Sequence, residues 1–321
     1  MIEVQGLTKF YGERPAIQDV TFSVPKGQVL GFLGPNGAGK STTMRILAGF
    51  LGMSAGTASV DGFDVFSHSL EARRRIGYLP ETNPLYDEMR VTGFLDLMCR
   101  LRGVPPSKRR GRVEHAIEAC GLQDRRRDVI GRLSKGLRQR VGLAQAIVHD
   151  PIALILDEPT AGLDVAQTRE TRNLVKELGR QHTVILSSHI LPEVSATCER
   201  VLIINEGRIV ADDTPQRLTE RLGRDHGPQI EMLLRGEGGA EEIEAKLREV
   251  AGVDEVLVSA EGDEMWRAVV NGTSAGLREE LTRVAVEAGL GVREVHARRL
   301  TLEDVFLSLT ADDEPDPAEQ E

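Results

Sequence analysis

The feature that most constrains this chain is a glycine-rich loop that lies between a predicted strand and a predicted helix. The loop reads Gly34-Pro35-Asn36-Gly37-Ala38-Gly39-Lys40-Ser41 and fits the pattern G-x-x-x-x-G-K-[ST]. Residues 28–33 before it are mostly apolar, as in a buried strand, and residues 41–47 predict a helix. Glycines let backbone N–H groups turn toward a phosphate, and the helix N-terminus favours negative charge. The segment therefore predicts a strand–loop–helix unit that binds nucleotide phosphates.

Two side chains at the end of the loop carry the chemistry that a nucleotide requires. Lys40 offers a positive charge to the outer phosphates, and the hydroxyl of Ser41 can ligate Mg²⁺. Thr42 follows in the first turn of the predicted helix and is included among the nucleotide-binding residues. A chance glycine-rich turn is the alternative, but the position between strand and helix argues against it.

A pair of acidic residues, Asp157 and Glu158, ends a second apolar strand at residues 153–156. That strand would hold Asp157 at an edge of the sheet where it can reach the Mg²⁺ shell. Glu158 can polarise a water for attack on the γ-phosphate. A helix N-cap pair is the alternative for these acids. The two motifs together predict an ATPase or a GTPase, and the Asn-Lys-x-Asp pattern that reads guanine does not occur in the sequence.

The segment between the two motifs resembles the signature of ATP-binding cassette (ABC) proteins. Residues 133–140 read L-S-K-G-L-R-Q-R, where the usual form begins L-S-G-G-Q, and Ser134 lies 23 residues before Asp157. Residues 161–164, which end in Asp164, resemble the D-loop of the family. Ser134, Gly136 and nearby N–H groups would start a helix and so form an anion site.

Two single residues extend the resemblance. His189, 31 residues after Glu158, closes a predicted strand as the switch histidine of ABC proteins does. Tyr11 matches the aromatic residue that stacks on adenine. The resemblance covers residues 1 to about 220. It implies an α/β P-loop fold with a RecA-like core, an antiparallel β subdomain and a helical insertion.

The resemblance also implies how the chain works. Two cassettes would pair head to tail around two ATP molecules, each ATP lying between Lys40 of one copy and Ser134 of the other. Because this chain has one cassette, its partner would be a second copy of itself or a homologous cassette. Glu158, His189 and Lys40 would be the catalytic residues, with ATP and Mg²⁺ as cofactors.

Three residues depart from the common pattern of the family. Lys135 and Leu137 replace a glycine and a glutamine of the signature, and Glu81 stands where the Q-loop glutamine is usual. A carboxylate at residue 81 could ligate Mg²⁺, or it could point to solvent or cap the helical insertion. The forms Y-L-P-E and L-S-K-G-x-R-Q-R resemble those of the drug, gliding-motility and ABC-2-type export branch.

The chain divides into parts of different composition. We expect an ATPase domain at residues 1–222, with a helical subdomain at about 85–140 that Pro105-Pro106 breaks into two helices. Residues 223–311 show the order β-α-β-β-α-β of a ferredoxin-like α+β domain, for which we expect a regulatory or accessory role. Residues 221–321 carry a net charge of −13, whereas residues 1–220 carry +3. The acidic segment 312–321 predicts a disordered tail.

The helical insertion contains a basic cluster. Residues 100–127 contain nine Lys and Arg and three acids. A solvated helical face, contact with anionic cytoplasmic lipid and binding of nucleic acid are the three explanations. Nucleic acid is the weakest of them, because aromatic residues are scarce nearby.

Composition excludes several classes of protein. No apolar run reaches the ~18 residues of a membrane-spanning helix, and the first residues lack the pattern of a signal peptide. The three cysteines are far apart, so a disulfide framework is not expected. Together with these exclusions, the resemblance to ABC proteins implies a cytoplasmic ATPase subunit that drives a separate polytopic ABC-2-type permease, an exporter, at the inner face of the plasma membrane. A soluble ABC ATPase acting on nucleic acid or ribosomes is the alternative, and no nucleic-acid partner is expected.

Overall fold

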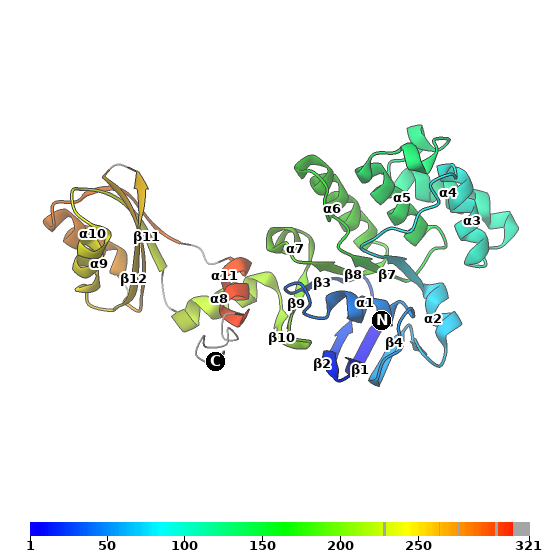
Figure 1. Cartoon of the computed structure of the whole chain (residues 1–321), viewed down its shortest axis with the longest axis horizontal. Coiled ribbons are helices and arrows are strands. Elements are labelled where there is room, and N and C mark those ends of the chain that lie inside the picture. Colours follow the sequence, from blue (N-terminus) through cyan, green and yellow to red (C-terminus); the bar gives the residue numbers. More distant parts are fainter. Residues whose placement is uncertain (227–228, 263, 275, 299–300, 311–321) are drawn as a thin grey trace. The chain divides into compact units, whose positions relative to one another are not determined.

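The computed structural model describes residues 1–226, 229–262, 264–274, 276–298 and 301–310. The chain forms two compact units, Met1–Pro215 and Gln216–Glu321 (Figure 1). The predicted boundary after residue 222 falls inside helix α8 (Pro215–His226), and the domain limits stay a prediction. The predicted disordered tail at residues 312–321 lies outside the described residues.

A six-stranded sheet forms the centre of the first unit, in the order β10-β9-β3-β8-β7-β6. Five of its strands are parallel, and β10 is antiparallel at one edge. Strands β3, β7 and β8 are buried along their whole length, as expected for a parallel sheet covered on both faces. The six strands are β3 (Val29–Leu33), β6 (Ile76–Leu79), β7 (Ala153–Asp157), β8 (Thr183–Ser188), β9 (Arg200–Asn205) and β10 (Arg208–Asp213).

A second, antiparallel sheet has the order β2-β1-β4-β5. Its strands are β1 (Ile2–Tyr11), β2 (Arg14–Val24), β4 (Ala55–Val60) and β5 (Phe63–Asp64). Helix α1 (Lys40–Leu47) shares one hydrophobic core with both sheets: Met44 and Leu47 cluster with Ile2 of β1 and Phe32 of β3. Because α1 packs on both sheets, the loop that precedes it is held in a fixed position.

The helical insertion comprises α3 (Val91–Leu101), α4 (Pro106–Ala119) and α5 (Lys135–Ile147), with short 3₁₀ turns at Gln123–Arg125 and Ile130–Arg132. Pro106 is the first residue of α4, so the predicted break between two helices is confirmed. Figure 1 shows these helices on the side of β7 and β8 away from β1, β2 and β4.

Four more helices complete the elements up to residue 226, namely α2 (Ser69–Arg75), α6 (Val165–Gly179), α7 (Leu191–Thr197) and α8. The sequence predicted α6 but not the other three. Helices α2 and α7 have seven residues each, too few for a helical apolar period to be recognised. Among the described residues, no helix has the length and hydropathy needed to span a bilayer.

The second unit contains a four-stranded antiparallel sheet in the order β12-β13-β11-β14. Helices α9 and α10 pack on one face of this sheet, against alternate residues of β11 such as Ile230, Met232 and Leu234. This order is that of the predicted ferredoxin-like domain, which is confirmed. The elements are β11 (Gln229–Arg235), α9 (Ala240–Arg248), β12 (Val253–Gly262), β13 (Met265–Gly272), α10 (Leu277–Glu287), β14 (Gly291–Ala297) and α11 (Leu302–Thr310).

Candidate active site

Three neighbouring strands of the central sheet deliver the predicted catalytic residues to one edge. Strands β3, β8 and β7 are parallel and adjacent, so their C-terminal ends lie together. The glycine-rich loop follows β3, His189 follows β8, and Asp157 ends β7. Ligands of open α/β sheets bind outside these C-terminal ends. The topology thus brings together segments more than a hundred residues apart in the chain.

The backbone of the loop requires glycine at two positions. Gly37 and Gly39 have φ angles of 85° and 106°, which favour glycine strongly. A Cβ at Gly39 would also lie 2.6 Å from the carbonyl oxygen of Ala16. Gly39 is the residue immediately before α1, so the loop runs directly into the helix N-terminus.

Lys40 is buried at the start of α1, with 6% of its surface exposed. Its ammonium donates hydrogen bonds to the carbonyl oxygens of Gly34 at 2.7 Å and Pro35 at 3.1 Å. The same nitrogen lies 3.9 Å from Oε1 of Glu158. Burial lowers the pKa of Lys40, and the nearby carboxylates, Glu158 first, oppose that shift. The loop therefore holds a positive charge in its interior.

Asp157 is fully buried at the end of β7 and has one satisfied and one unsatisfied oxygen. Oδ1 accepts hydrogen bonds from Ser41 Oγ at 3.1 Å and Ser187 Oγ at 2.6 Å. Oδ2 has no hydrogen-bond partner among the residues that the structure describes. A buried carboxylate oxygen without a partner is costly. A hard cation or its bound water would satisfy it, so Asp157 and Ser41 fit a Mg²⁺ ion.

Glu158 has a left-handed backbone with φ of 49°, a strained conformation for a residue with a side chain. Its amide is held by Ser187, with the acceptors Oγ at 3.0 Å and the carbonyl oxygen at 3.3 Å. Both carboxylate oxygens of Glu158 lie 3.0 Å from Nδ1 of His189. A carboxylate oxygen accepts hydrogen bonds, so Nδ1 of His189 is placed to donate to Glu158. His189 thus orients the carboxylate that is the candidate general base.

These residues line one pocket of about 400 Å³. Its lining residues are Asn36, Gly37, Gly39, Lys40, Ser41, Thr42, Glu81, Glu158, Ala161 and His189. Gly34, Ala38 and Asp157 are buried in the fold, and Pro35 contributes the carbonyl that Lys40 contacts. Glu81 is exposed and lines the pocket, whereas its contact with a metal stays a prediction.

Sequence reasoning missed Ser187, which contacts both acidic residues. The only signal was a polar pair, Ser187-Ser188, at the end of an otherwise apolar strand before His189. The register of β7 and β8 places Ser187 beside Asp157, and that pairing cannot be read from the sequence.

The signature segment lies at a different hollow, of about 270 Å³. Ser134 and Gly136 line it, together with Leu137, Arg140, Gln167, Glu170 and Thr171. Ser134 is the N-cap of α5, and its Oγ accepts from the amide of Leu137 at 3.4 Å. Asp164 likewise caps α6, accepting from the amide of Gln167 at 2.8 Å. Neither Ser134 nor Asp164 is among the described residues that line the first pocket.

Two more predicted residues lie outside the first pocket. Tyr11 ends β1 with 53% of its surface exposed, and the ammonium of Lys9 lies 5.6 Å from its ring centre. Stacking of Tyr11 on adenine stays a prediction. Lys135 is exposed, and its ammonium lies over Gly162 of the D-loop. The ammonium occupies the position that a Cβ atom at residue 162 would take.

The segment around Glu81 is bonded to the helix that carries the signature. Asn83 donates to the carbonyl oxygen of Arg138 at 3.2 Å, and Asp87 forms an ion pair with Arg138 at 2.7 Å. Gln139 of the same helix donates to the carbonyl oxygen of Pro159 at 2.8 Å, next to Glu158. Movement of α5 would therefore act on both sides of the pocket.

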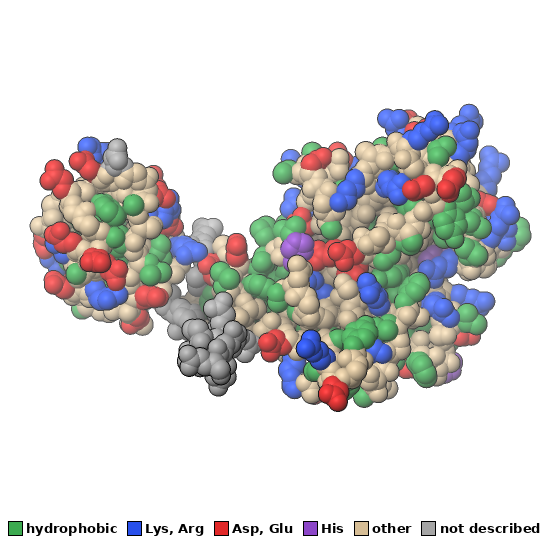
Figure 2. Space-filling view, viewed as in Figure 1, with side chains coloured by type: hydrophobic (Ala, Val, Ile, Leu, Met, Phe, Trp, Pro, Cys, Tyr) green, Lys and Arg blue, Asp and Glu red, His purple; other side chains and the backbone are tan. Residues whose placement is uncertain are grey.

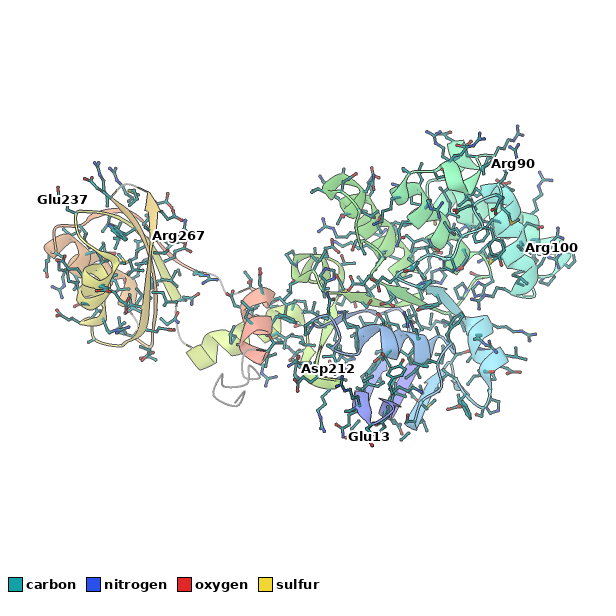
Figure 3. All side chains as sticks on the ribbon, in the orientation of Figure 1. Glu13, Arg90, Arg100, Asp212, Glu237 and Arg267 are labelled. Carbon is teal, nitrogen blue, oxygen red and sulfur yellow. The ribbon has the colours of Figure 1, made fainter. Side chains whose placement is uncertain are left out.

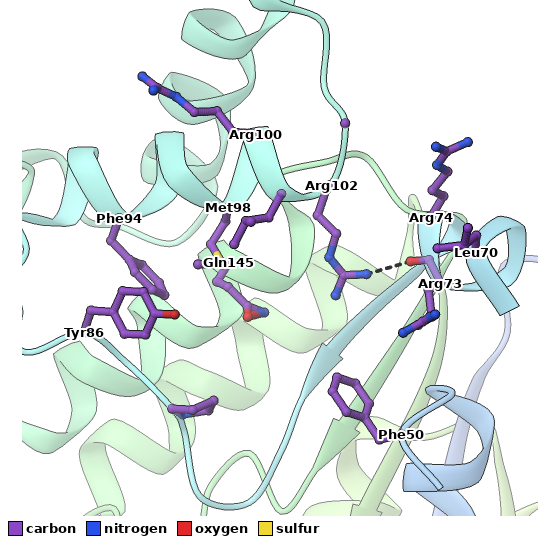
Figure 4. Close-up of a pocket in the computed structure, with 13 residues that line it drawn as sticks. Phe50, Leu70, Arg73, Arg74, Tyr86, Phe94, Met98, Arg100, Arg102 and Gln145 are labelled. Atoms are coloured by element: carbon purple, nitrogen blue, oxygen red, sulfur yellow. Dashed lines mark hydrogen bonds between the residues drawn. The ribbon is translucent and has the colours of Figure 1, made fainter. Parts of the chain in front are cut away.

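A larger groove of about 530 Å³ lies beside this segment (Figure 4). Apolar side chains line it, and several are exposed: Phe50 by 66%, Leu70 by 62% and Leu101 by 68%. Figure 4 shows Phe94 and Tyr86 side by side, in an edge-to-face pair with ring centres 5.8 Å apart. Arginines complete the lining, namely Arg73, Arg74, Arg100 and Arg102.

Comparison with known proteins places the chain among transporter subunits. The family described as ABC transporter matches residues 17–161. Daunorubicin resistance ATP-binding protein DrrA3 of Streptomyces coeruleorubidus is 34% identical over 317 residues, 97% of this chain and 96% of that relative. Nod factor export ATP-binding protein I of Burkholderia orbicola is 34% identical over 319 residues, 96% of each chain. A solved structure of an ATP-binding subunit of an ABC transporter has a TM-score of 0.63 and 29% identity, covering 70% of this chain and 93% of that one.

Proposed function

The chain belongs to the ABC transporter family, as an ATP-binding and ATP-hydrolysing subunit, and we propose that it drives an exporter through a separate ABC-2-type permease. The proposed catalytic activity rests on one pocket that is lined by Lys40, Glu158 and His189. Asp157 is buried at the end of β7, next to Glu158. The match to two relatives along nearly their whole length supports the export part.

In hydrolysis, we propose that the loop amides and Lys40 bind the phosphates of ATP. Glu158 then orients the attacking water and accepts its proton, while His189 holds the Glu158 carboxylate in place. When bound, Mg²⁺ would be held by Ser41, Asp157 and Glu81 and would offset the negative charge of the phosphates. The buried position of Lys40 keeps its charge poorly screened, which strengthens its attraction for phosphate.

We propose that a second cassette completes each site. Ser134 and Gly136 lie at the N-terminal end of α5, where backbone amides attract anions, but they line a hollow apart from the phosphate loop of the same chain. Head-to-tail pairing would place this end on the nucleotide of the partner copy. Asp164 would act at the same interface between the two cassettes.

The apolar groove supports the permease as partner. Its exposed Phe50, Leu70 and Leu101 would be covered by an amphipathic segment of a membrane protein, and its arginines would pair with acidic residues of that segment. Pro84 and Tyr86 of the groove belong to the segment that follows Glu81. Docking would thereby couple the permease to the nucleotide pocket, at the cytoplasmic face of the membrane.

The test is permease-stimulated ATP hydrolysis with the permease reconstituted in vesicles. Leu101→Asp places a charge in the groove and should abolish stimulation, since a buried unpaired carboxylate opposes docking. Val286→Asp, at a position 59% exposed in the second unit, is the matched control and should keep it. Equal stimulation of both variants, with unchanged thermal unfolding, would show that the groove is not the docking site of the permease.

A further inference from the structure

The outer surface of the helical insertion carries two adjacent hollows that share Thr92. The first, about 410 Å³, lies between α3 and α4 and is lined by Thr92, Asp96, Arg100, Pro106, Arg109, Arg110, Val113 and Glu114. The second, about 390 Å³, is lined by Arg90, Thr92, Gly93, Arg126 and Arg127. We call these two hollows the arginine surface. Its described lining contains six arginines and two carboxylates.

Only two of the six arginines are neutralised by those carboxylates. Asp96 pairs with Arg100 at 2.6 Å, and Glu114 pairs with Arg126. The other four, Arg90, Arg109, Arg110 and Arg127, form no ion pair among the described residues. Two of these four donate to backbone carbonyl oxygens, Arg90 to residue 127 and Arg109 to residue 104. A carbonyl orients a guanidinium but leaves its charge uncompensated.

The chain as a whole has a net charge of −10, so the positive charge of the arginine surface is a local feature. Figure 2 shows Lys and Arg side chains gathered over the part of the first unit that contains α3 to α5. Arg90 and Arg100 lie at the outer edge of this part in Figure 3. Unpaired guanidinium groups around a hollow are suited to phosphate, which they bind with two parallel hydrogen bonds.

Two observations favour phospholipid over nucleic acid as the source of the phosphate. No aromatic side chain is among the described residues that line either hollow, so bases would find no stacking partner. Arg100 also lines the apolar groove, so the arginine surface is continuous with the proposed permease dock. A surface beside that dock would lie close to the bilayer.

We propose that the arginine surface binds the headgroups of anionic phospholipids. The bound lipid would orient the cassette toward the cytoplasmic leaflet, next to the permease. Each guanidinium near such a surface contributes roughly a fivefold increase in binding, so the unpaired arginines would act as a group.

The experiment is flotation of the full chain with vesicles, in the absence of nucleotide and permease. One set of vesicles contains phosphatidylcholine alone and the other contains about 30% phosphatidylglycerol, enough for a negative surface potential. The variant is Arg110→Gln with Arg127→Gln, because neither side chain forms a hydrogen bond or an ion pair with the described residues. Its matched control is Lys26→Gln with Arg293→Gln, which removes the same charge at exposed positions elsewhere.

The wild type should bind the anionic vesicles and not the neutral ones. The Arg110 and Arg127 variant should bind roughly 10- to 30-fold more weakly, and the control should stay within about twofold of the wild type. Binding should also weaken from about 0.1 M to about 0.5 M NaCl.

The results that would overturn the proposal concern charge selectivity, soluble phosphate and nucleic acid. One is equal binding to neutral and anionic vesicles, or equal loss in both double variants. Another is displacement of the chain from the vesicles by inorganic phosphate, which would identify a site for soluble anions. The third is tighter binding of oligothymidine than of vesicles at matched salt. Because no ATP is hydrolysed in this assay, its failure would not bear on the proposed ATPase function.

Discussion

The phosphate loop and the signature segment both lie at helix N-termini, yet they have different surroundings. Around the loop, Lys40 and Asp157 are buried, and Asp157 is bonded to Ser41 and Ser187. Ser134, in contrast, is exposed and caps its own helix. The first site is therefore prepared within one chain, whereas in the proposed head-to-tail pairing the second would be completed by the nucleotide of a partner copy. In that pairing, one half of each catalytic site (the prepared half, at the phosphate loop) would be built by folding and the other half by association.

The largest expected effect is on the prepared half. Glu158→Gln should bind ATP but hydrolyse it at least ~100-fold more slowly, because the amide cannot accept the proton of the attacking water. Phosphate release under saturating ATP measures it. Glu199→Gln, at an exposed position, is the control and should keep normal turnover. Wild-type turnover by a pure Glu158→Gln sample would remove Glu158 from the mechanism.

A smaller loss should follow from Ser187→Ala. This change removes one hydrogen bond from Asp157 and one from the amide of Glu158, each worth about 1 kcal/mol. Turnover should fall about tenfold, with the larger change in kcat, since the bonds orient catalytic groups rather than the adenosine. Ser195→Ala on α7 is the matched control. If Ser187→Ala and Ser195→Ala hydrolyse ATP at the same rate, the prepared half of the site does not depend on Ser187.

Helix α5 runs from the signature segment toward the prepared pocket of the same chain, where Gln139 bonds to Pro159, and His149 lies just beyond its end. His149 contacts the carbonyl oxygen of Ile76 at 3.1 Å, and burial lowers its pKa to about 4, with Arg102 and Arg112 adding to the shift. The unfolded chain binds a proton on His149 more tightly than the folded chain does. The contribution of His149 to the free energy of unfolding is therefore fully present above about pH 6.5 and falls as the pH drops toward 4. The free energy of unfolding measured with urea should fall by about 1 kcal/mol between pH 7.5 and 5.5 because of this residue.

The matched variant for that measurement is His149→Gln, which retains an N–H donor and cannot titrate. It should lose less stability than the wild type over the same pH interval. An identical loss in both proteins would assign the pH dependence to other groups, such as His182, whose pKa burial also lowers.

The smallest effect concerns Glu81, at the edge of the prepared pocket. Glu81→Gln should keep activity while changing the Mg²⁺ concentration for half-maximal turnover by about threefold, because a carboxylate is the stronger ligand. Glu81→Ala should harm permease-stimulated more than basal hydrolysis. Superimposable Mg²⁺ titrations of the wild type and both variants would show that residue 81 does not contact the metal.

The same comparison explains what could be predicted from sequence. The loop, Asp157 and Glu158 were predicted because each motif is local and its chemistry depends on neighbouring residues. Ser187 was missed because its role depends on the alignment of β7 with β8. The basic cluster at residues 100–127 was visible in the sequence, but its arrangement with Arg90 around two hollows depends on the packing of the helices. The apolar groove was beyond sequence reasoning, because residues such as Phe50 and Met98 meet only through the packing of α3 beside the central sheet.

The most direct test of the central claim mixes two inactive variants, Lys40→Ala and Ser134→Arg. A mixed dimer has one site with Lys40 from one copy and Ser134 from the other, and that site is intact. Each variant alone should be nearly inactive, while the equimolar mixture should recover up to roughly a quarter of wild-type turnover, since half of the dimers would be mixed. No recovery in a mixture proven to contain mixed dimers would contradict a site shared between two chains.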